Sequence, residues 1–395
     1  MIAREQQWLQ DWLIRQAGTS VNAESGRRRY PTEVRAESMI PKVLAREARR
    51  QHEAASAAQA AGHRQTALRL YEMALRAYIE AQHNLFADTD WKRSLMLRGQ
   101  SCMDAIVSLA PHSIERVDVP FEGASLPGLL HEGRADRPLL LYLPGMDGTK
   151  ETSSVGPLAS PLRSRGFRVF SLDGPGQGAA RVLNGVRLTP GAHARAVTAA
   201  LDCLKARGVW DGEAVYVLGS SMGTRWGLEA AAADRRIRGL AIIHACFGDQ
   251  RRLLCEAPPR FRKIMAYMAG LASEAEFEDF IAATDLPEDL RVECPTFVGV
   301  GEFDPLTTVA EARALMARNL RGPSALYVFE DAFHGGHELK ALCGLGDIEA
   351  ATDWLADLAK GRAPASGEFF LRAHEGAGIY APKPLGDYPE GEMET

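Results

Sequence analysis

One stretch near the middle of the chain constrains the fold more than any other. Residues 215–218 form an apolar run that leads into Gly219-Ser-Ser-Met-Gly223, and residues 225–233 have the composition of a helix. A serine between two glycines at a strand-to-helix turn adopts a strained backbone conformation, and only small neighbours let the strand and the helix pass so closely. The stretch therefore predicts a nucleophile elbow, in which the hydroxyl of Ser221 projects beyond the end of a strand.

Apolar runs elsewhere in the chain predict the sheet to which this turn belongs. They occupy residues 139–143, 167–172, 237–243, 296–300 and 325–329, and helical stretches separate most of them. Continuous apolar runs are typical of parallel strands that are buried on both faces. Residues 114–121 and 125–131 alternate like a hairpin. We therefore predict an α/β fold with a doubly wound, mostly parallel sheet, whose ligands bind beyond the carboxyl ends of the strands.

The remaining regions divide the chain into segments around this sheet. The first part is helical, most clearly at residues 66–84, where apolar residues form one stripe, and again at residues 91–109. The alternation of strand and helix lapses after Cys246, and an insertion at this point of such a sheet often forms a lid. We expect an N-terminal helical cap domain at residues 1–113, the core at 114–246 and 290–360, a helical lid insertion at 247–289, and a C-terminal tail at 361–395.

The composition narrows the class of protein. With 395 residues, 46% apolar and 25% charged, the chain is long enough for two domains around a substantial core. The net charge of −5 gives no electrostatic case for a nucleic-acid partner, and no apolar run approaches the ~18 residues of a membrane span. The six scattered cysteines form no disulfide or metal-binding pattern, and the N-terminus lacks a signal-peptide layout. We expect a cytoplasmic protein without a metal or other cofactor; the sequence is compatible with a homodimer.

A serine hydroxyl needs a base to become a nucleophile, and the base needs an orienting acid. In this type of fold the acid and the histidine follow later strands, in that order. Asp304 comes shortly after the run 296–300, and His334 comes shortly after the run 325–329. We predict a catalytic triad of Ser221, His334 and Asp304.

Alternatives to two of these residues stay open at the level of sequence. Glu302 or Asp331 could be the acid, and His337 could be the base, although a helix could already begin there. His244 ends an apolar strand, and we interpret it as a hydrogen-bonded core residue.

Backbone N–H groups are expected to bind the developing oxyanion. One belongs to Met222, at the start of the helix after the serine. The second comes from the glycine-containing loop at residues 144–151, where Met146 is the candidate and Asp147 the alternative. The stretch Asp173-Gly-Pro-Gly-Gln-Gly178 lacks the spacing of a phosphate-binding loop, so we interpret it as a rigid turn beside the elbow.

Several further side chains are candidates for contacts with the substrate. Tyr71, Tyr78 and Trp91 could line a pocket beside the sheet, but aromatic residues at helical spacing are more often core. Asp147 follows the candidate oxyanion donor, and Asp249 ends another strand, so either carboxylate could touch a bound molecule.

Together these features resemble one branch of the α/β-hydrolases. The resemblance rests on the helical N-terminal region and on the stretches 144–151, 173–178, 219–223, 301–304 and 333–334, and it extends from about residue 40 to 360. The branch includes 2,6-dihydroxypseudooxynicotine hydrolase, fungal heptaketide-shortening hydrolases and FrsA-like proteins. FrsA-like members depart from a standard triad, whereas this chain retains all three residue types.

The resemblance implies a substrate pocket between the helical cap and the sheet, with Ser221, Asp304 and His334 in the positions of the family triad. It further implies hydrolysis of a carbon–carbon bond next to a ketone, or of an ester, in an aromatic or polyketide-like small molecule. An acyltransferase or cyclase that uses the same acyl-enzyme is the alternative. A hydrolase fold that binds a partner without catalysis is a third hypothesis.

Overall fold

The structure is a computed structural model that describes residues 8, 11–12, 19–22, 26–131, 136–155, 159–251, 253–254, 259–330, 332–334, 346–371 and 383–384. Its strands are β1 Thr19–Asn22, β2 Gly26–Arg29, β3 Ile114–Phe121, β4 Ala124–His131, β5 Leu139–Leu143, β6 Arg168–Leu172, β7 Val215–Ser220, β8 Ile237–Ile243, β9 Thr296–Gly301, β10 Ser324–Phe329, β11 Gly367–Leu371 and β12 Lys383–Pro384. Its helices are η1 Glu37–Met39, α2 Ile40–Ala60, α3 Arg64–His83, α4 Asp90–Leu109, α5 Thr152–Val155, α6 Ala159–Ser164, α7 Gly178–Val182, α8 Ala192–Ala206, α9 Met222–Ala233, α10 Pro259–Ala269, α11 Glu274–Ala283, α12 Val309–Asn319 and α13 Asp347–Ala359.

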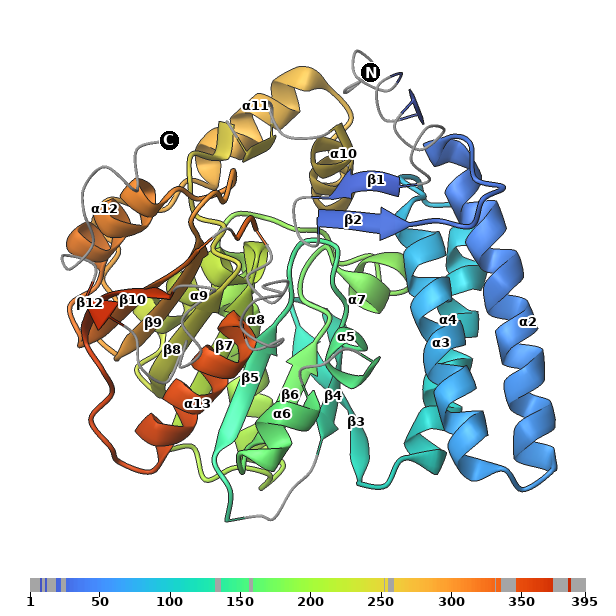
Figure 1. Cartoon of the computed structure of the whole chain (residues 1–395), viewed down its shortest axis with the longest axis horizontal. Coiled ribbons are helices and arrows are strands. Elements are labelled where there is room, and N and C mark those ends of the chain that lie inside the picture. The colour runs from blue at the N-terminus through green and yellow to red at the C-terminus, as the bar shows by residue number, and fades with distance from the viewer. Residues whose placement is uncertain are drawn as a thin grey trace.

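A ten-stranded sheet in the order β12-β11-β10-β9-β8-β7-β5-β6-β4-β3 is the centre of the fold (Figure 1). Neighbouring strands pair in parallel along the part of the sheet that runs in the order β11-β10-β9-β8-β7-β5-β6. The pairs β3 with β4, β4 with β6 and β11 with β12 are antiparallel. Strands therefore form at all the predicted apolar runs, and the hairpin at residues 114–131 is confirmed. The predicted doubly wound, mostly parallel sheet is confirmed with them.

Every residue of β5 and β7 is buried, because helices cover both faces of the sheet. Alternate residues of β5 enter two different clusters. Leu141 packs with side chains of α8 and α9, whereas Leu140 packs with side chains of α6 and α13. Burying one such leucine contributes about 1.5–3 kcal/mol, so the central strands hold their carboxyl ends firmly in place.

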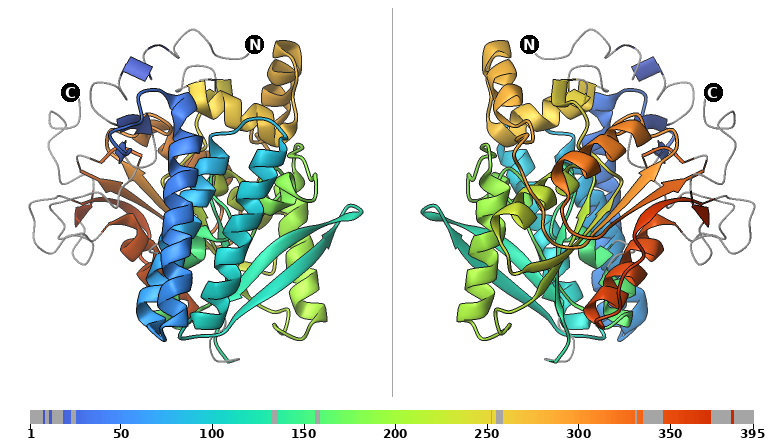
Figure 2. Two further views of the ribbon diagram at one scale, coloured as in Figure 1. Left: turned by 90° about the vertical axis from the view of Figure 1, so that its right-hand side faces the viewer. Right: turned by 90° about the vertical axis from the view of Figure 1, so that its left-hand side faces the viewer.

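Helices α2, α3 and α4 form a separate layer beside the β3–β4 edge of the sheet (Figures 1 and 2). They have a hydrophobic core of their own, which includes Leu75, Tyr78, Met103 and Ile106. This layer contacts the rest of the protein where α3 meets α5 and where α4 meets α7. Between β8 and β9 the chain forms α10 and α11, which agree with the helices expected in the insertion.

Two regions differ from the sequence expectation. Residues 19–22 and 26–29 pair as a two-stranded ribbon, β1 with β2, within the N-terminal region for which the sequence predicts a helical cap domain. The segment expected to be a tail adds β11 to the sheet parallel to β10, because burying Phe370 and Leu371 favours an extra strand over a solvated chain. Most of residues 1–18 lie outside the described residues. In the described ranges, none of the helices has the length and the apolar content of a membrane span.

Candidate active site

The turn after β7 has the backbone geometry that its sequence predicts. Ser221 has φ 52° and ψ −126°, a positive φ that costs a non-glycine residue of order 1–3 kcal/mol. A Cβ added to Gly219 would lie 2.5 Å from the carbonyl oxygen of Gly223, and one added to Gly223 would lie 2.1 Å from that of Leu143. Glycine is therefore required on both sides of the serine for β7, α9 and the end of β5 to meet.

The structure brings the three residues of the predicted triad together at the carboxyl ends of β7, β9 and β10. The hydroxyl of Ser221 lies 3.1 Å from Nε2 of His334, and Nδ1 of His334 lies 2.9 Å from Oδ2 of Asp304. The exposed fractions of Ser221, Asp304 and His334 are 5%, 3% and 0%. With Nδ1 protonated, His334 donates to Asp304 and accepts from Ser221, which is the arrangement needed for proton transfer from the serine.

The carboxylate of Asp304 is fixed by the chain that follows it. Its Oδ1 accepts hydrogen bonds from the backbone N–H groups of Leu306, at 2.8 Å, and Thr307, at 3.4 Å. Glu302 is the other described candidate for the acid, but the carboxylate that bonds to Nδ1 of His334 is that of Asp304. The remaining alternatives, Asp331 and His337, lie outside the described residues.

A second hydrogen-bonded chain runs beside the first. The hydroxyl of Ser220 lies 3.0 Å from Nδ1 of His244, and Nε2 of His244 lies 3.1 Å from Oδ2 of Asp347. His244 has φ 50°, a second strained non-glycine residue in this region, and its ring centroid is 6.0 Å from that of His334. His244 is thus hydrogen-bonded, as expected, and it ties the residue before the nucleophile to the start of α13.

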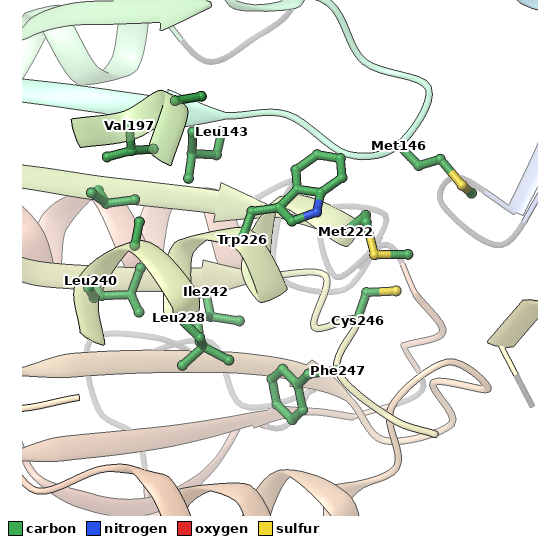
Figure 3. Close-up of a cluster of buried hydrophobic side chains, with 14 of the residues drawn as sticks. Leu143, Met146, Val197, Met222, Trp226, Leu228, Leu240, Ile242, Cys246 and Phe247 are labelled. Carbon is green, nitrogen blue, oxygen red and sulfur yellow. The ribbon is translucent and has the colours of Figure 1, made fainter. Parts of the chain in front are cut away.

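The two methionines expected to supply oxyanion donors lie at the same end of the central strands (Figure 3). Met222 is the first residue of α9, where a backbone N–H has no partner within the helix. Among the described residues, no acceptor is recorded for the N–H of Met146. The loop that carries Met146 packs against the elbow, since a Cβ on Gly223 would lie 2.7 Å from the carbonyl oxygen of Pro144. Two unused N–H groups thus lie close to Ser221.

A buried group of charges beneath this loop was missed by sequence reasoning. Nζ of Lys150 lies 2.5 Å from Glu151 and 2.9 Å from Asp173, and all three side chains are almost fully buried. Burial alone lowers the pKa of Lys150, but the two carboxylates raise it above its usual value. Burial raises the pKa of Glu151, but the neighbouring Lys150 outweighs burial, and the pKa of Glu151 lies below its usual value. For Asp173 the effect of burial dominates, and its pKa lies above the usual value. The charges anchor the end of the loop to the turn after β6.

The structure assigns the aromatic candidates to the helical layer. Tyr71 and Tyr78 are buried in the core of α2–α4, and the hydroxyl of Tyr71 donates to Gln59 at 2.9 Å. Trp91 is 44% exposed, and with Tyr78 of α3 it borders a cavity of about 370 Å³. The other residues that line this cavity come from α2 and α4. None of the three residues of the triad lines this cavity. Tyr71 and Tyr78 are therefore core residues of the helical layer.

The two carboxylate candidates lie in different surroundings. Asp147 faces the insertion, with Oδ2 3.6 Å from Nη1 of Arg260. His83, at the end of α3, lies close enough for Asp147 to act on its pKa, which burial lowers to about 4. Asp249 is exposed and accepts a hydrogen bond from the backbone N–H of Arg251 at 2.8 Å. Asp147 is therefore the one of the two that lies between the helical layer, the insertion and the elbow.

A polar cluster joins the helical layer, the core and the insertion, and we call Asp88, Lys92, Arg181 and Tyr267 the cap junction. Arg181 donates to both carboxylate oxygens of Asp88, at 3.1 and 3.0 Å, and the hydroxyl of Tyr267 donates to the same carboxylate at 2.8 Å. Nζ of Lys92 is 4.2 Å from the centroid of the Tyr267 ring, and the guanidinium of Arg181 is 4.3 Å from it. Burial lowers the pKa of Lys92 to about 7.

The strand order and the elbow are those of the α/β-hydrolase fold. The chain is 26% identical over 299 residues to 2,6-dihydropseudooxynicotine hydrolase of Paenarthrobacter nicotinovorans. The aligned residues cover 73% of this chain and 76% of that protein. It is 33% identical over 156 residues to hydrolase acrC of Aspergillus aculeatus, but that match covers only 34% of this chain and 36% of the relative. No protein-family model matches the sequence.

Solved structures agree with the fold. The crystal structure of 2,6-dihydroxy-pseudo-oxynicotine hydrolase superimposes with a TM-score of 0.70 at 23% identity, covering 86% of this chain and 93% of that one. AbyA5 superimposes with a TM-score of 0.59 at 20% identity, covering 80% of this chain and 89% of that one. The predicted resemblance to this branch of hydrolases is confirmed.

Proposed function

We propose that this α/β-hydrolase is a serine hydrolase that cleaves a carbonyl compound through Ser221, His334 and Asp304. The observation that carries the proposal is the 3.1 Å contact between the strained Ser221 and His334, whose other nitrogen is held by Asp304. His334 takes the proton of Ser221 as Oγ bonds to the carbonyl carbon. The oxyanion accepts hydrogen bonds from the N–H groups of Met222 and Met146.

Collapse of the tetrahedral adduct breaks the bond to the leaving group, which receives the proton from His334. Water, deprotonated by the same imidazole, then attacks the acyl-enzyme, releases a carboxylic acid and restores Ser221. Carbon–carbon cleavage requires a leaving carbanion that the substrate itself stabilises, as in a 1,3-diketone or an aryl ketone. The resemblance to hydrolases that act next to a ketone supports this bond type, and ester hydrolysis is the alternative that the same residues allow.

In this proposal α2–α4 act as the cap and α10–α11 as the lid, so the substrate lies between them and the strand ends. The position of Asp147 beside Arg260 of the insertion supports it as the side chain that contacts the substrate there. The site requires no metal or cofactor, because the proton transfer and the charge stabilisation are both performed by this chain.

Products formed in oxygen-18 water test the proposal. Benzoylacetone, an aryl 1,3-diketone, and 4-nitrophenyl butyrate are incubated with the protein, and the acids are analysed by mass spectrometry. Hydrolysis predicts one oxygen-18 atom in each released carboxylic acid, and cleavage of benzoylacetone would identify carbon–carbon hydrolysis. Unlabelled acyl products on an added amine or alcohol would instead identify an acyltransferase. Failure of a fluorophosphonate to label Ser221 would contradict the serine mechanism.

A further inference from the structure

The turn at residues 173–178, after β6, has no part in the mechanism so far, yet it holds both ends of the loop that carries Met146. We call residues 144–150 the oxyanion loop. Gln177 is 3% exposed, and its Nε2 donates to the carbonyl oxygen of Gly145 at 2.8 Å. Its Oε1 accepts from the N–H of Gly174 at 3.3 Å. Because one partner is an acceptor and the other a donor, the orientation of the side-chain amide is fixed.

The other end of the oxyanion loop is held by Asp173. Its Oδ1 accepts from the backbone N–H of Lys150 at 2.8 Å, and its Oδ2 accepts from the N–H of Ala179 at 2.7 Å. Gly178 has φ 41°, and a Cβ at this position would lie 2.4 Å from Cγ of Asp173. The glycine thus leaves room for the carboxylate, and the turn reaches the loop with two side chains, Asp173 and Gln177.

The contact with Gly145 has a consequence for the next residue. In a trans peptide the carbonyl and the N–H of one peptide unit point in opposite directions, and no cis peptide occurs among the described residues. The carbonyl of Gly145 accepts from Gln177 and also from the backbone N–H of Gly148 at 2.9 Å. These two donors fix the plane of the Gly145–Met146 peptide, so the N–H of Met146 points away from the turn.

The opposite side of that peptide is where the oxyanion is expected. The N–H of Met146 has no recorded acceptor among the described residues, and the loop touches the elbow at Gly223. We propose that Gln177 is a positioning residue for the oxyanion hole, which acts through the Gly145–Met146 peptide to direct the N–H of Met146 toward the reacting carbonyl oxygen. This inference rests on the proposed serine mechanism. It also gives the Gly-Pro-Gly-Gln-Gly turn a functional reason for its glutamine.

Two substitutions at Gln177 test the role of its donor. Gln177→Met fills a similar volume without a hydrogen bond, and Gln177→Glu keeps the shape but replaces the N–H₂ group by an acceptor. The first readout is the second-order rate of Ser221 labelling by a fluorophosphonate, whose P=O oxygen occupies the same donors. The second is kcat and KM for 4-nitrophenyl butyrate, with kcat expressed per titrated Ser221.

Removing an oxyanion donor outright lowers kcat by roughly 10²–10³-fold, so losing its alignment should lower kcat and the labelling rate by about 10- to 100-fold. KM should stay within about threefold, because the ground-state carbonyl uses these donors less than the transition state does. The matched control is Asn184→Ala. Asn184 lies just beyond the other end of α7, and its Nδ2 donates to the carbonyl of Ser125 at 2.9 Å. This hydrogen bond does not involve the oxyanion loop.

Three results would overturn the inference. A normal labelling rate in Gln177→Glu would do so even if Gln177→Met failed to fold. An equal loss in Asn184→Ala would show a general effect of perturbing α7, and a rise in KM with kcat unchanged would show a role in binding alone. Failure of the proposed function itself is distinguishable, because the wild-type protein would then resist the fluorophosphonate.

Discussion

The triad and the cap junction both join distant parts of the chain, but they differ in how completely their polar atoms are enclosed. The side chains of the triad are buried and linked by hydrogen bonds of 2.9 and 3.1 Å. At the cap junction the side chain of Asp88 is 61% exposed. Close by, buried nitrogen atoms of His83 and Arg260 have no hydrogen-bond partner among the described residues.

The difference follows from what holds each place together. The triad residues follow strands of one ladder, whose backbone hydrogen bonds and buried side chains fix the strand ends. The junction joins helices of separate layers mainly through side chains. We therefore expect the positions of Ser221 and His334 to depend on the strand ends, whereas the helical layer and the insertion can shift without moving either residue.

The largest expected effect comes from removing the nucleophile. Ser221→Ala should lower kcat by about 10⁴- to 10⁶-fold, because the remaining residues of a triad cannot replace the serine. Ser220→Ala is the matched control, since it removes a neighbouring hydroxyl that bonds to His244 but does not contact His334. Rates with 4-nitrophenyl butyrate, measured alongside urea unfolding, check both variants. A greater loss in Ser220→Ala than in Ser221→Ala would contradict the assignment of the nucleophile.

Sequence could predict the triad because each of its residues is marked locally. Gly219 and Gly223 identify the elbow, and Asp304 and His334 each follow an apolar run that predicts a strand. The order of the strands then brings these loops to one edge. Nothing comparable marks Lys150, because a lysine in a glycine-containing loop is usually solvated. Its burial depends on Asp173, which lies 23 residues away and follows a different strand.

The same limit applies to the termini and the helical layer. Residues 369–371, Phe-Phe-Leu, are apolar in the sequence, but their pairing with β10 depends on an unpaired sheet edge that sequence does not reveal. Tyr71 and Tyr78 have helical spacing whether they face a core or a pocket, so only the packing of α2 and α4 could decide between the two.

An intermediate effect, on stability, is expected from removing the buried charge of Lys150 beneath the oxyanion loop. This group of charges lies beside the strand ends, which we expect to be the rigid region. Lys150→Met leaves the carboxylates of Glu151 and Asp173 buried without their cation, and breaking a buried pair in this way costs about 3–5 kcal/mol. Arg116→Met is the matched control, because its partner Asp104 is exposed and surface pairs contribute about 0–1 kcal/mol. Urea unfolding measures both, and equal losses would contradict the distinction.

The smallest effect is expected at the cap junction. Tyr267→Phe removes the hydroxyl that donates to Asp88 but keeps the ring beneath Lys92 and Arg181. A hydrogen bond to a charged carboxylate contributes about 1.5–3 kcal/mol, and the exposure of Asp88 favours the lower end. Tyr216→Phe is the control, since its hydroxyl has no recorded partner in the described part of the chain and its loss should cost less. If the junction is independent of the strand ends, kcat with 4-nitrophenyl butyrate stays within about threefold in both variants. A tenfold fall in kcat for Tyr267→Phe alone would instead mean that the helical layer holds Ser221 and His334 in place, and the contrast between the two regions would be wrong.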